Sequence, residues 1–280
     1  MNDTPMKLPV EDDFNDVIGK AQKGQEITTE DLSERVGVSE ESIRKIRRGE
    51  FDEAAVSAVG KYLDLNVDAL LKIGRGDWYP EQPDPVDGFE LIASPFYDWH
   101  VNAYLLWDPN TKGAIAFDTG TDPELMLAKI NELGLQLKTL FLTHSHGDHI
   151  EGAPKILSET GANAVISRLE PSVDFDAATI DEGFQSNVGC MSVEMFNTTG
   201  HTSGGATFVV GGLDRDFAFV GDAIFAGSMG GPNVSYDNSL KALKEILSLA
   251  DDTVLASGHG PLTTVGQEKE MNCFYVGLPG

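Results

Sequence analysis

The chain has 280 residues, of which 41% are hydrophobic and 30 are glycines, enough to form a sizeable core in one large or two smaller domains. Its 45 acidic and 20 basic residues give a net charge of −25, which argues against generic binding to the phosphate backbone of nucleic acids. The two cysteines form no CxxC pair, which argues against a disulfide framework and favours a reducing compartment. Because we find no signal-like N-terminus and no apolar run of membrane-spanning length, we expect a cytoplasmic protein.

The pattern of the sequence changes near residue 75, which predicts two domains, 1–75 and 76–280. Residues 10–74 read as short helices, whereas residues 89–280 alternate apolar strands with helical stretches. Between them, the segment WYPEQPDPVDG holds three prolines and reads as a linker.

The first part contains helix caps at regular intervals. Thr28 is typical of a helix N-cap and Gly37 of a helix end, and Ser39 and Gly49 bound a second short helix in the same way. Further leucines and a valine over residues 63–71 supply the apolar positions of a closing helix.

Over residues 14–74 this pattern resembles the helix-turn-helix domain of the Cro and phage-repressor family. The resemblance implies DNA recognition by the helix that begins at Ser39, with Arg44, Lys45 and Arg48 as the candidate contacts. Against DNA as a partner, two glutamates occupy the first turn of that helix, and residues 1–75 hold 16 acidic and 11 basic residues. The alternative is a small helical adaptor that packs on the second domain or forms a homodimer.

In the second part, apolar runs lead into four polar segments. LKTLFLT, SVEMFN, DFAFV and DTVLA each precede such a segment, so the polar side chains should gather at one edge of a sheet. The first segment, HSHGDH, should end in a helix running over HIEGAPKIL. Imidazoles and carboxylates at this spacing predict a metal site. The candidate ligands are His144, His146, Asp148, His149, His201, Asp222 and His259.

The segments THSHGDH, TGHTSGG, GDAIF and SGHGP resemble the metallo-β-lactamase superfamily, and the resemblance extends over residues 88–275. It implies an α/β fold class: an αββα sandwich, here preceded by a small all-α helix-turn-helix domain. It also implies two divalent metal ions, one held by His144, His146 and His201, the other by Asp148, His149 and His259, with Asp222 as the bridge. Zinc suits this mixture of nitrogen and oxygen ligands, and iron or manganese would also fit.

The same resemblance gives a role to Asp118, which ends a strand in the segment AFDTG. A carboxylate at this place orients a ligand imidazole, whereas the simpler interpretation is a turn residue. His100 is interpreted as a surface or hydrogen-bonded core histidine, and Asn102 and Tyr104 as structural residues.

The C-terminal run SGHGPLTTVGQEKEMNCF is similar to the short glyoxalase II-type thioesterases. This implies thioester hydrolysis by a hydroxide shared between two metal ions, with Asp222 and Asp148 as the catalytic carboxylates. Two departures leave the substrate contacts unknown: no basic helical extension follows the last ligand motif, and GGPN stands where an arginine is usual. Tyr236, Lys241 and Lys244 are weak candidates, and the two lysines fit better on the solvated face of a helix.

Two other functions remain open. A single iron ion at His144, His201 and Asp222 would suit oxidation of a persulfide, which needs redox-active iron. The second open function is a DNA-binding regulator whose second domain senses a metabolite. The acidic residues Glu40 and Glu41 argue against it.

Overall fold

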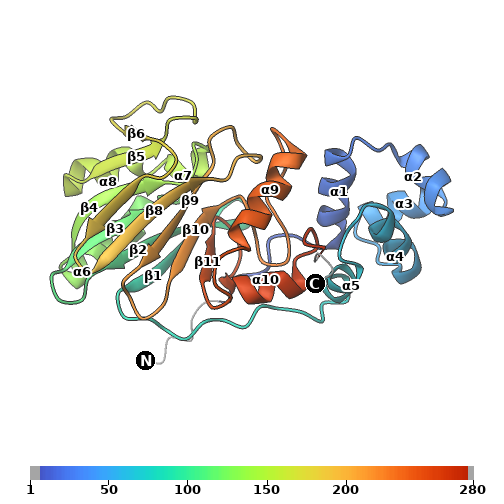
Figure 1. Cartoon of the computed structure of the whole chain (residues 1–280), viewed down its shortest axis with the longest axis horizontal. Coiled ribbons are helices and arrows are strands. Elements are labelled where there is room, and N and C mark those ends of the chain that lie inside the picture. The colour runs from blue at the N-terminus through green and yellow to red at the C-terminus, as the bar shows by residue number, and fades with distance from the viewer. Residues whose placement is uncertain (1–6, 277–280) are drawn as a thin grey trace.

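The computed structural model describes residues 7–276. Two six-stranded sheets face each other, helices cover their outer faces, and five helices precede the first strand (Figure 1). This arrangement confirms the predicted α/β fold class, an αββα sandwich preceded by an all-helical region.

The first sheet has the strand order β1-β2-β3-β4-β5-β6. Its first three strands are antiparallel neighbours, and the pairs from β3 to β6 are parallel. Parallel neighbours end at the same edge of the sheet, so their following loops lie close together. The strands are β1 (Phe89–Phe96), β2 (Trp99–Trp107), β3 (Gly113–Phe117), β4 (Gln136–Leu142), β5 (Asn163–Ser167) and β6 (Ala178–Ile180).

The second sheet has the order β12-β11-β10-β9-β8-β7. Only β10 and β11 are parallel in it, and both lead into loops that carry predicted ligands. The strands are β7 (Gln185–Val188), β8 (Met191–Asn197), β9 (Ala206–Gly211), β10 (Phe217–Gly221), β11 (Val254–Ser257) and β12 (Thr263–Thr264).

Aromatic side chains fill the space between the sheets. The rings of Phe117 on β3 and Phe219 on β10 stack with centroids 3.8 Å apart, and Phe141 and Phe208 pack beside them. Large stacked rings bury much apolar area and fix the distance between the two sheets. The edge that carries the polar loops is therefore built on a rigid base.

Helices α6 (Pro123–Leu133) and α8 (Ala153–Thr160) cover the first sheet, and α9 (Tyr236–Ile246) and α10 (Val265–Met271) cover the second. The single helix expected over HIEGAPKIL is instead two helices. The short α7 (Gly147–Ile150) ends before Gly152, and α8 begins after it. Gly152 packs tightly against Thr119, because an added Cβ there would lie 3.1 Å from the Thr119 Cβ.

The helical region consists of α1 (Phe14–Gly24), α2 (Thr29–Val36), α3 (Glu40–Arg47), α4 (Glu53–Tyr62) and α5 (Val67–Gly74). Thr28 accepts a hydrogen bond from the Asp31 N–H at the start of α2, and Ser39 caps α3 in the same manner. Gly37 ends α2 with φ +69°, a conformation that glycine adopts without strain. The short turn between α2 and α3 agrees with the helix pattern predicted from the sequence.

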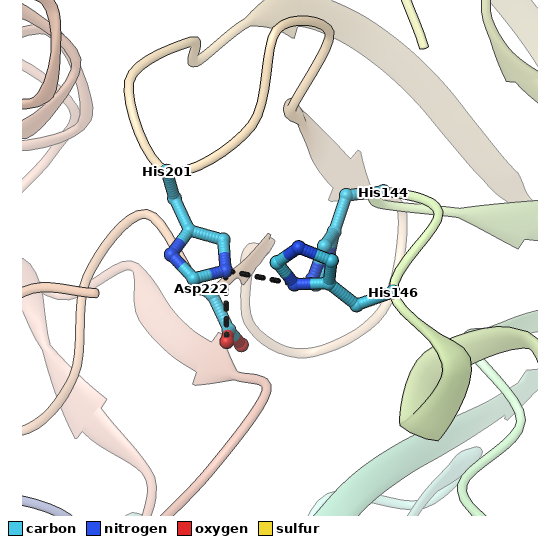
Figure 2. Close-up of side chains that lie close together, drawn as sticks. All are labelled: His144, His146, His201 and Asp222. Carbon is cyan, nitrogen blue, oxygen red and sulfur yellow. Dashed lines mark hydrogen bonds and ion pairs between the residues drawn. The ribbon is translucent and has the colours of Figure 1, made fainter. Parts of the chain in front are cut away.

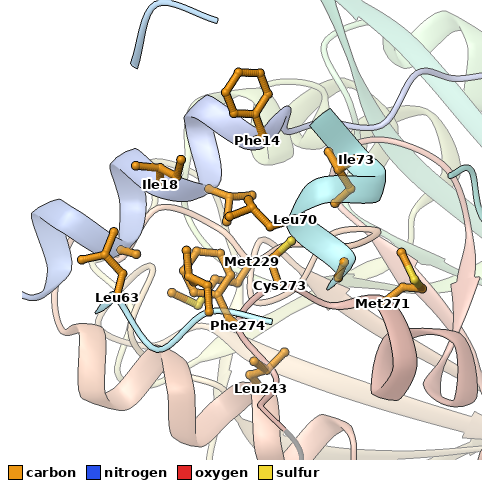
Figure 3. Close-up of a cluster of buried hydrophobic side chains, with 14 of the residues drawn as sticks. Phe14, Ile18, Leu63, Leu70, Ile73, Met229, Leu243, Met271, Cys273 and Phe274 are labelled. Atoms are coloured by element: carbon orange, nitrogen blue, oxygen red, sulfur yellow. The ribbon is translucent and has the colours of Figure 1, made fainter. Parts of the chain in front are cut away.

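The helical region shares one hydrophobic core with the second sheet (Figure 3). Ile18 and Leu70 from the helices belong to the same buried cluster as Leu243 on α9 and Phe274. The backbone N–H of Asn66 also donates to the Cys273 carbonyl oxygen, at 2.8 Å. The division near residue 75 stays a prediction, and across it the apolar contacts are continuous.

The predicted linker, residues 78–88, contains no helix or strand and lies along the sandwich. Tyr79 donates its hydroxyl to the Leu8 carbonyl, and Gln82 donates to that of Leu262. Both cysteines are free thiols. Within the described part of the chain, no helix has the length and apolar character needed to cross a bilayer.

Candidate metal centre

All seven predicted ligands lie together at one edge of the sandwich. His144 and His146 follow β4, and Asp148 and His149 lie in α7. The loops after β8, β10 and β11 carry the other three, which are His201, Asp222 and His259. The structure thus brings together residues from four segments that are far apart in the sequence.

His144, His146, His201 and Asp222 form the first group (Figure 2). The His146 Nδ1 lies 3.1 Å from His144 Nε2 and 3.0 Å from His201 Nε2, and the latter lies 3.4 Å from Asp222 Oδ2. Each residue offers one ligand atom, and these atoms lie within 4.8 Å of one another. Three imidazole nitrogens and a carboxylate oxygen at such distances can surround a divalent ion.

Asp148, His149 and His259 form the second group. The Nε2 of His259 lies 3.4 Å from Asp148 Oδ2, and that of His149 lies 3.7 Å from the same oxygen. Asp222 lies between the groups: its Oδ1 is 3.3 Å from His149 Nε2, and its Oδ2 is 3.7 Å from His259 Nε2. One carboxylate therefore faces both groups of imidazoles.

Hydrogen bonds at Nδ1 orient four of the imidazoles, and for His144 the partner is the Thr143 hydroxyl at 3.0 Å. The Nδ1 of His149 lies 2.8 Å from Asp118 Oδ2, that of His201 lies 2.9 Å from the Gly231 carbonyl, and that of His259 lies 2.8 Å from the His100 carbonyl. An Nδ1–H donor in each ring leaves Nε2 free to face the centre. Asp118 thus occupies the place expected for it, and it also accepts from the N–H of Thr143 at 2.8 Å.

The electrostatic field of the cluster favours positive charge at its centre. Burial lowers the pKa of His144 well below its ordinary value, which keeps this imidazole neutral, as metal ligation requires. Burial alone would raise the pKa of Asp222, but the imidazoles of His149 and His259 lower it well below its usual range. Burial would lower the pKa of His259, yet Asp222 and Asp148 raise it to about 9. The Asp222 carboxylate is thus ionised.

Two polar atoms in the cluster test whether it fits a metal ion. The Nε2 of His149 and the Oδ1 of Asp222 are buried and have no hydrogen-bond partner among the described residues. The two atoms lie 3.3 Å apart without forming a hydrogen bond, and leaving such atoms unpaired costs about 1–3 kcal/mol each, a cost that a cation bound to both would remove. Gly258 completes the cradle, because an added Cβ there would lie 2.1 Å from Asp222 Oδ1. The cluster fits a divalent metal ion.

Sequence reasoning missed Glu170, whose buried carboxylate joins two ligand-bearing loops. Its Oε2 accepts from the N–H of Ser145 at 3.0 Å and from the hydroxyl of the same residue at 2.5 Å. Its Oε1 accepts from the Thr202 hydroxyl at 2.5 Å and from the Gly204 N–H at 2.9 Å, in the loop of His201. An acid in SRLEPS gives no local signal of this role, which depends on contacts between distant segments.

Sequence reasoning also missed the segment before α1, which lies at the rim of the cluster. A Cβ on Gly260 would lie 3.3 Å from the Glu11 backbone nitrogen, and Asp12 accepts from Ser228 at 2.5 Å. The Lys20 ammonium lies 5.0 Å from the Phe225 ring centroid, and that ring lies 5.7 Å from the His259 ring. The helical region therefore contributes to the surroundings of the metal centre.

The prediction for His100 was partly wrong. Its backbone carbonyl accepts from His259, but its own ring Nδ1 is buried without a hydrogen-bond partner in the part of the chain described. Asn102 and Tyr104 do act structurally, since both donate to the Ser257 carbonyl, at 3.0 and 2.6 Å. Lys241 and Lys244 are exposed on α9, as expected for a solvated helix face.

The candidate DNA contacts are exposed on α3, but two of the three lie beside acids. Arg44 is paired with Glu40, and Arg48 lies 3.6 Å from Glu41 and 3.7 Å from Glu50. Lys45 is exposed and has no ion pair within residues 7–276. The acids reduce the positive charge that this helix presents to a phosphate backbone.

Comparison with known proteins agrees with this geometry. The chain is 30% identical over 204 residues to the hydroxyacylglutathione hydrolase GloC of Haemophilus influenzae, a match that covers 64% of this chain and 95% of that one. A hydroxyacylglutathione hydrolase of Methylobacterium nodulans is 33% identical over 161 residues, and the match covers 55% of this chain and 60% of that protein's length.

Among solved structures, the BLEG-1 B3 metallo-β-lactamase superposes with a TM-score of 0.58 at 26% identity, covering 68% of this chain and all of that one. The family model described as the metallo-β-lactamase superfamily matches residues 96–259, the stretch that runs from the end of β1 to the last histidine of the cluster. The chain belongs to the metallo-β-lactamase superfamily.

Proposed function

We propose that this protein is a binuclear metal-dependent hydrolase that cleaves small thioesters of the hydroxyacylglutathione type. The observation that carries the proposal is the position of Asp222, whose Oδ1 and Oδ2 face the two groups of imidazoles. The similarity to GloC, whose name states hydroxyacylglutathione hydrolysis, supports the choice of a thioester.

In this proposal His144, His146 and His201 hold one ion, Asp148, His149 and His259 hold the other, and Asp222 bridges them. Zinc suits these nitrogen and oxygen donors, and iron and manganese remain alternatives. Two such ions, when bound, supply Lewis acidity and a water of lowered pKa.

The residues of the chain orient the reaction. The Asp148 side chain is 13% exposed, and its carboxylate can accept a hydrogen bond from the attacking water. The water oxygen adds to the thioester carbon, the carbon–sulfur bond breaks, and the thiolate leaves and takes a proton. Asp118 positions the imidazole of His149 throughout, because its carboxylate holds the Nδ1–H.

Oxidation of a persulfide by one iron ion is a weaker candidate. That chemistry would use His144, His201 and Asp222 and would give no role to the second group. The unpaired Nε2 of His149 is directed to the same centre and favours two ions.

The test is turnover of S-D-lactoylglutathione by the zinc-loaded protein, with metal content measured on the same sample. We expect hydrolysis by the wild-type protein and its loss in Asp222→Ala, whereas Asp181→Ala, an exposed acid that belongs to neither group, should behave as wild type. A protein that holds two ions and hydrolyses no thioester would refute the substrate class. Turnover retained in Asp222→Ala would refute the proposed site.

A further inference from the structure

A cavity of about 300 Å³ lies where α1 and α3 meet the loop after β10. We call it the α1–α3 cavity, and it is lined by Lys20, Lys23, Arg47, Gly231 and Pro232, together with Asp12, Asp16 and Gly19. Three cationic side chains of the helical region thus face a wall supplied by the metallo-β-lactamase domain.

The wall of this cavity is bonded directly to the metal centre. The carbonyl of Gly231 accepts from His201 Nδ1 at 2.9 Å. On the same side, the ammonium of Lys20 donates to the Met229 carbonyl at 2.8 Å, two residues before that glycine. The Gly231–Pro232 loop therefore joins the cavity to the His201 ring, at the side of the ring that carries Nδ1.

Lys20 is paired with Asp12, so the remaining positive charge of the cavity comes from Lys23 and Arg47. Asp12 forms an ion pair with Lys20 and accepts a hydrogen bond from the Ser228 hydroxyl. Asp16 accepts from the backbone N–H of Asp13 at the start of α1. Lys23 has no ion pair within the described chain, and it is exposed.

Arg47 lies flat against α1, because a Cβ on Gly19 would come within 2.2 Å of its guanidinium nitrogens. This guanidinium donates to the Asn15 carbonyl and has no carboxylate partner among residues 7–276. It is half-buried, and a half-buried cation of this kind binds an anion more strongly than a fully solvated one.

The rest of the hydrolase domain offers no comparable charge. It holds nine basic residues, and none of them lines the α1–α3 cavity. Six of the nine lie within 4.0 Å of an acidic side chain or, in one case, of a glutamine amide: Lys129, Lys138, Lys155, Arg168, Arg215 and Lys269. The other three, Lys112, Lys241 and Lys244, do not line the cavity either, so all of its cations come from the helical region.

We propose that the α1–α3 cavity binds the carboxylate end of the thiol carrier, so that the N-terminal helices select the substrate of the hydrolase. The inference rests on the thioesterase function and names its substrate class: thioesters whose carrier bears carboxylates. A cavity of about 300 Å³ is at the small end of ligand pockets and suits a short acidic carrier better than a nucleotide.

The experiment compares carriers of different charge with the same acyl group. The full-length, zinc-loaded protein is assayed with S-D-lactoylglutathione, with S-lactoyl-N-acetylcysteamine, which is neutral, and with lactoyl-coenzyme A. The variants are Lys23→Gln and Lys23→Glu, and the matched control is Lys61→Gln, an exposed lysine of α4 that removes the same charge from the same helical region.

For Lys23→Gln we expect the KM for S-D-lactoylglutathione to rise about three- to fivefold, as for loss of one partly exposed ion pair, with a larger rise for Lys23→Glu. The KM for the neutral thioester should rise far less, and added salt should reduce the difference. Equal effects of Lys23→Gln and Lys61→Gln, or an equal rise for the neutral thioester, would overturn the proposal. A Lys23 effect seen only with coenzyme A would replace carboxylate by phosphate recognition and so overturn it too.

A binding measurement distinguishes a cavity that does not recognise the carrier from a protein that does not hydrolyse the thioester. S-methylglutathione cannot be hydrolysed as a thioester, and its binding to the zinc-loaded protein is measured by calorimetry. Binding that weakens in Lys23→Gln supports the cavity even where no thioester is turned over. No binding to wild-type protein, or binding that Lys23→Gln leaves unchanged, overturns it.

Discussion

The sandwich and the helical region hold their polar and charged side chains in different ways. In the sandwich, the proposed ligands lie in α7 and in the loops that follow strands, and hydrogen bonds at Nδ1 orient four of their rings. In the helical region, the cations project from helix surfaces, where Arg44 and Arg48 lie beside acids while Arg47 turns towards α1. The sequence motifs at the edge of the sheets therefore indicate the chemistry of the site, whereas the pattern of the helical region indicates only its fold.

The largest expected effect concerns the metal content of the two groups. His259→Ala removes a residue of the second group only, so we expect the bound zinc to fall from about two ions per chain to about one. His201→Ala should remove the other ion. Elemental analysis after dialysis measures both, and loss of both ions in each single variant would show that the two groups act as one site.

A core substitution tests whether the two regions are independent. Leu70 is fully buried in the cluster that joins them, so Leu70→Ala should lower the free energy of unfolding by about 2–5 kcal/mol. Because the core is continuous, we expect a single transition in denaturant, with tryptophan fluorescence and circular dichroism coinciding. Leu125→Ala, on the exposed face of α6, is the control. Two separate transitions would contradict the shared core.

The role of Glu170 predicts a smaller effect on metal affinity. Glu170→Ala removes the acceptor that joins the loops of Ser145 and Thr202, so zinc affinity should fall about 10–100-fold. Competition with a chelator measures it, with the exposed Glu124→Ala as control. Glu170→Gln should lie between, because its amide can accept some of these hydrogen bonds. If Glu170→Ala kept the zinc affinity of the wild-type protein but had a lower melting temperature, Glu170 would have only a structural role.

The smallest effect is expected for DNA. Since acids lie beside Arg44 and Arg48, the double variant Arg44→Ala with Arg48→Ala should bind duplex DNA no differently from the wild-type protein at physiological salt. Fluorescence anisotropy across a salt series is the measurement. Salt-dependent binding lost in the double variant would reverse this comparison and make α3 a recognition helix.

The sequence was informative where chemistry is local. Three histidines and an aspartate within six residues, from His144 to His149, predict a metal site without knowledge of the fold. The caps at Thr28 and Ser39 likewise predict helix ends, because capping depends on residues two or three positions away. These predictions needed only short-range geometry.

The rest depends on contacts between distant residues. Glu170 acts on Ser145, 25 positions earlier, and Lys20 donates to Met229, 209 positions later. A single acid or lysine carries no signal of such a partner, since most are solvated surface residues. Packing of the helical region on the second domain was one of the alternatives that the sequence left open, but the residues that meet there, and with them the α1–α3 cavity, were not predicted.

The shared core has a practical consequence for work with fragments. A chain cut at residue 75 would separate Asn66 from its backbone partner Cys273 and uncover the apolar face of α9 and α10. Such a fragment retains every proposed metal ligand, yet it exposes a large hydrophobic surface and invites aggregation. Expression trials that treat residues 76–280 as a free-standing enzyme would therefore confuse insolubility with lack of activity.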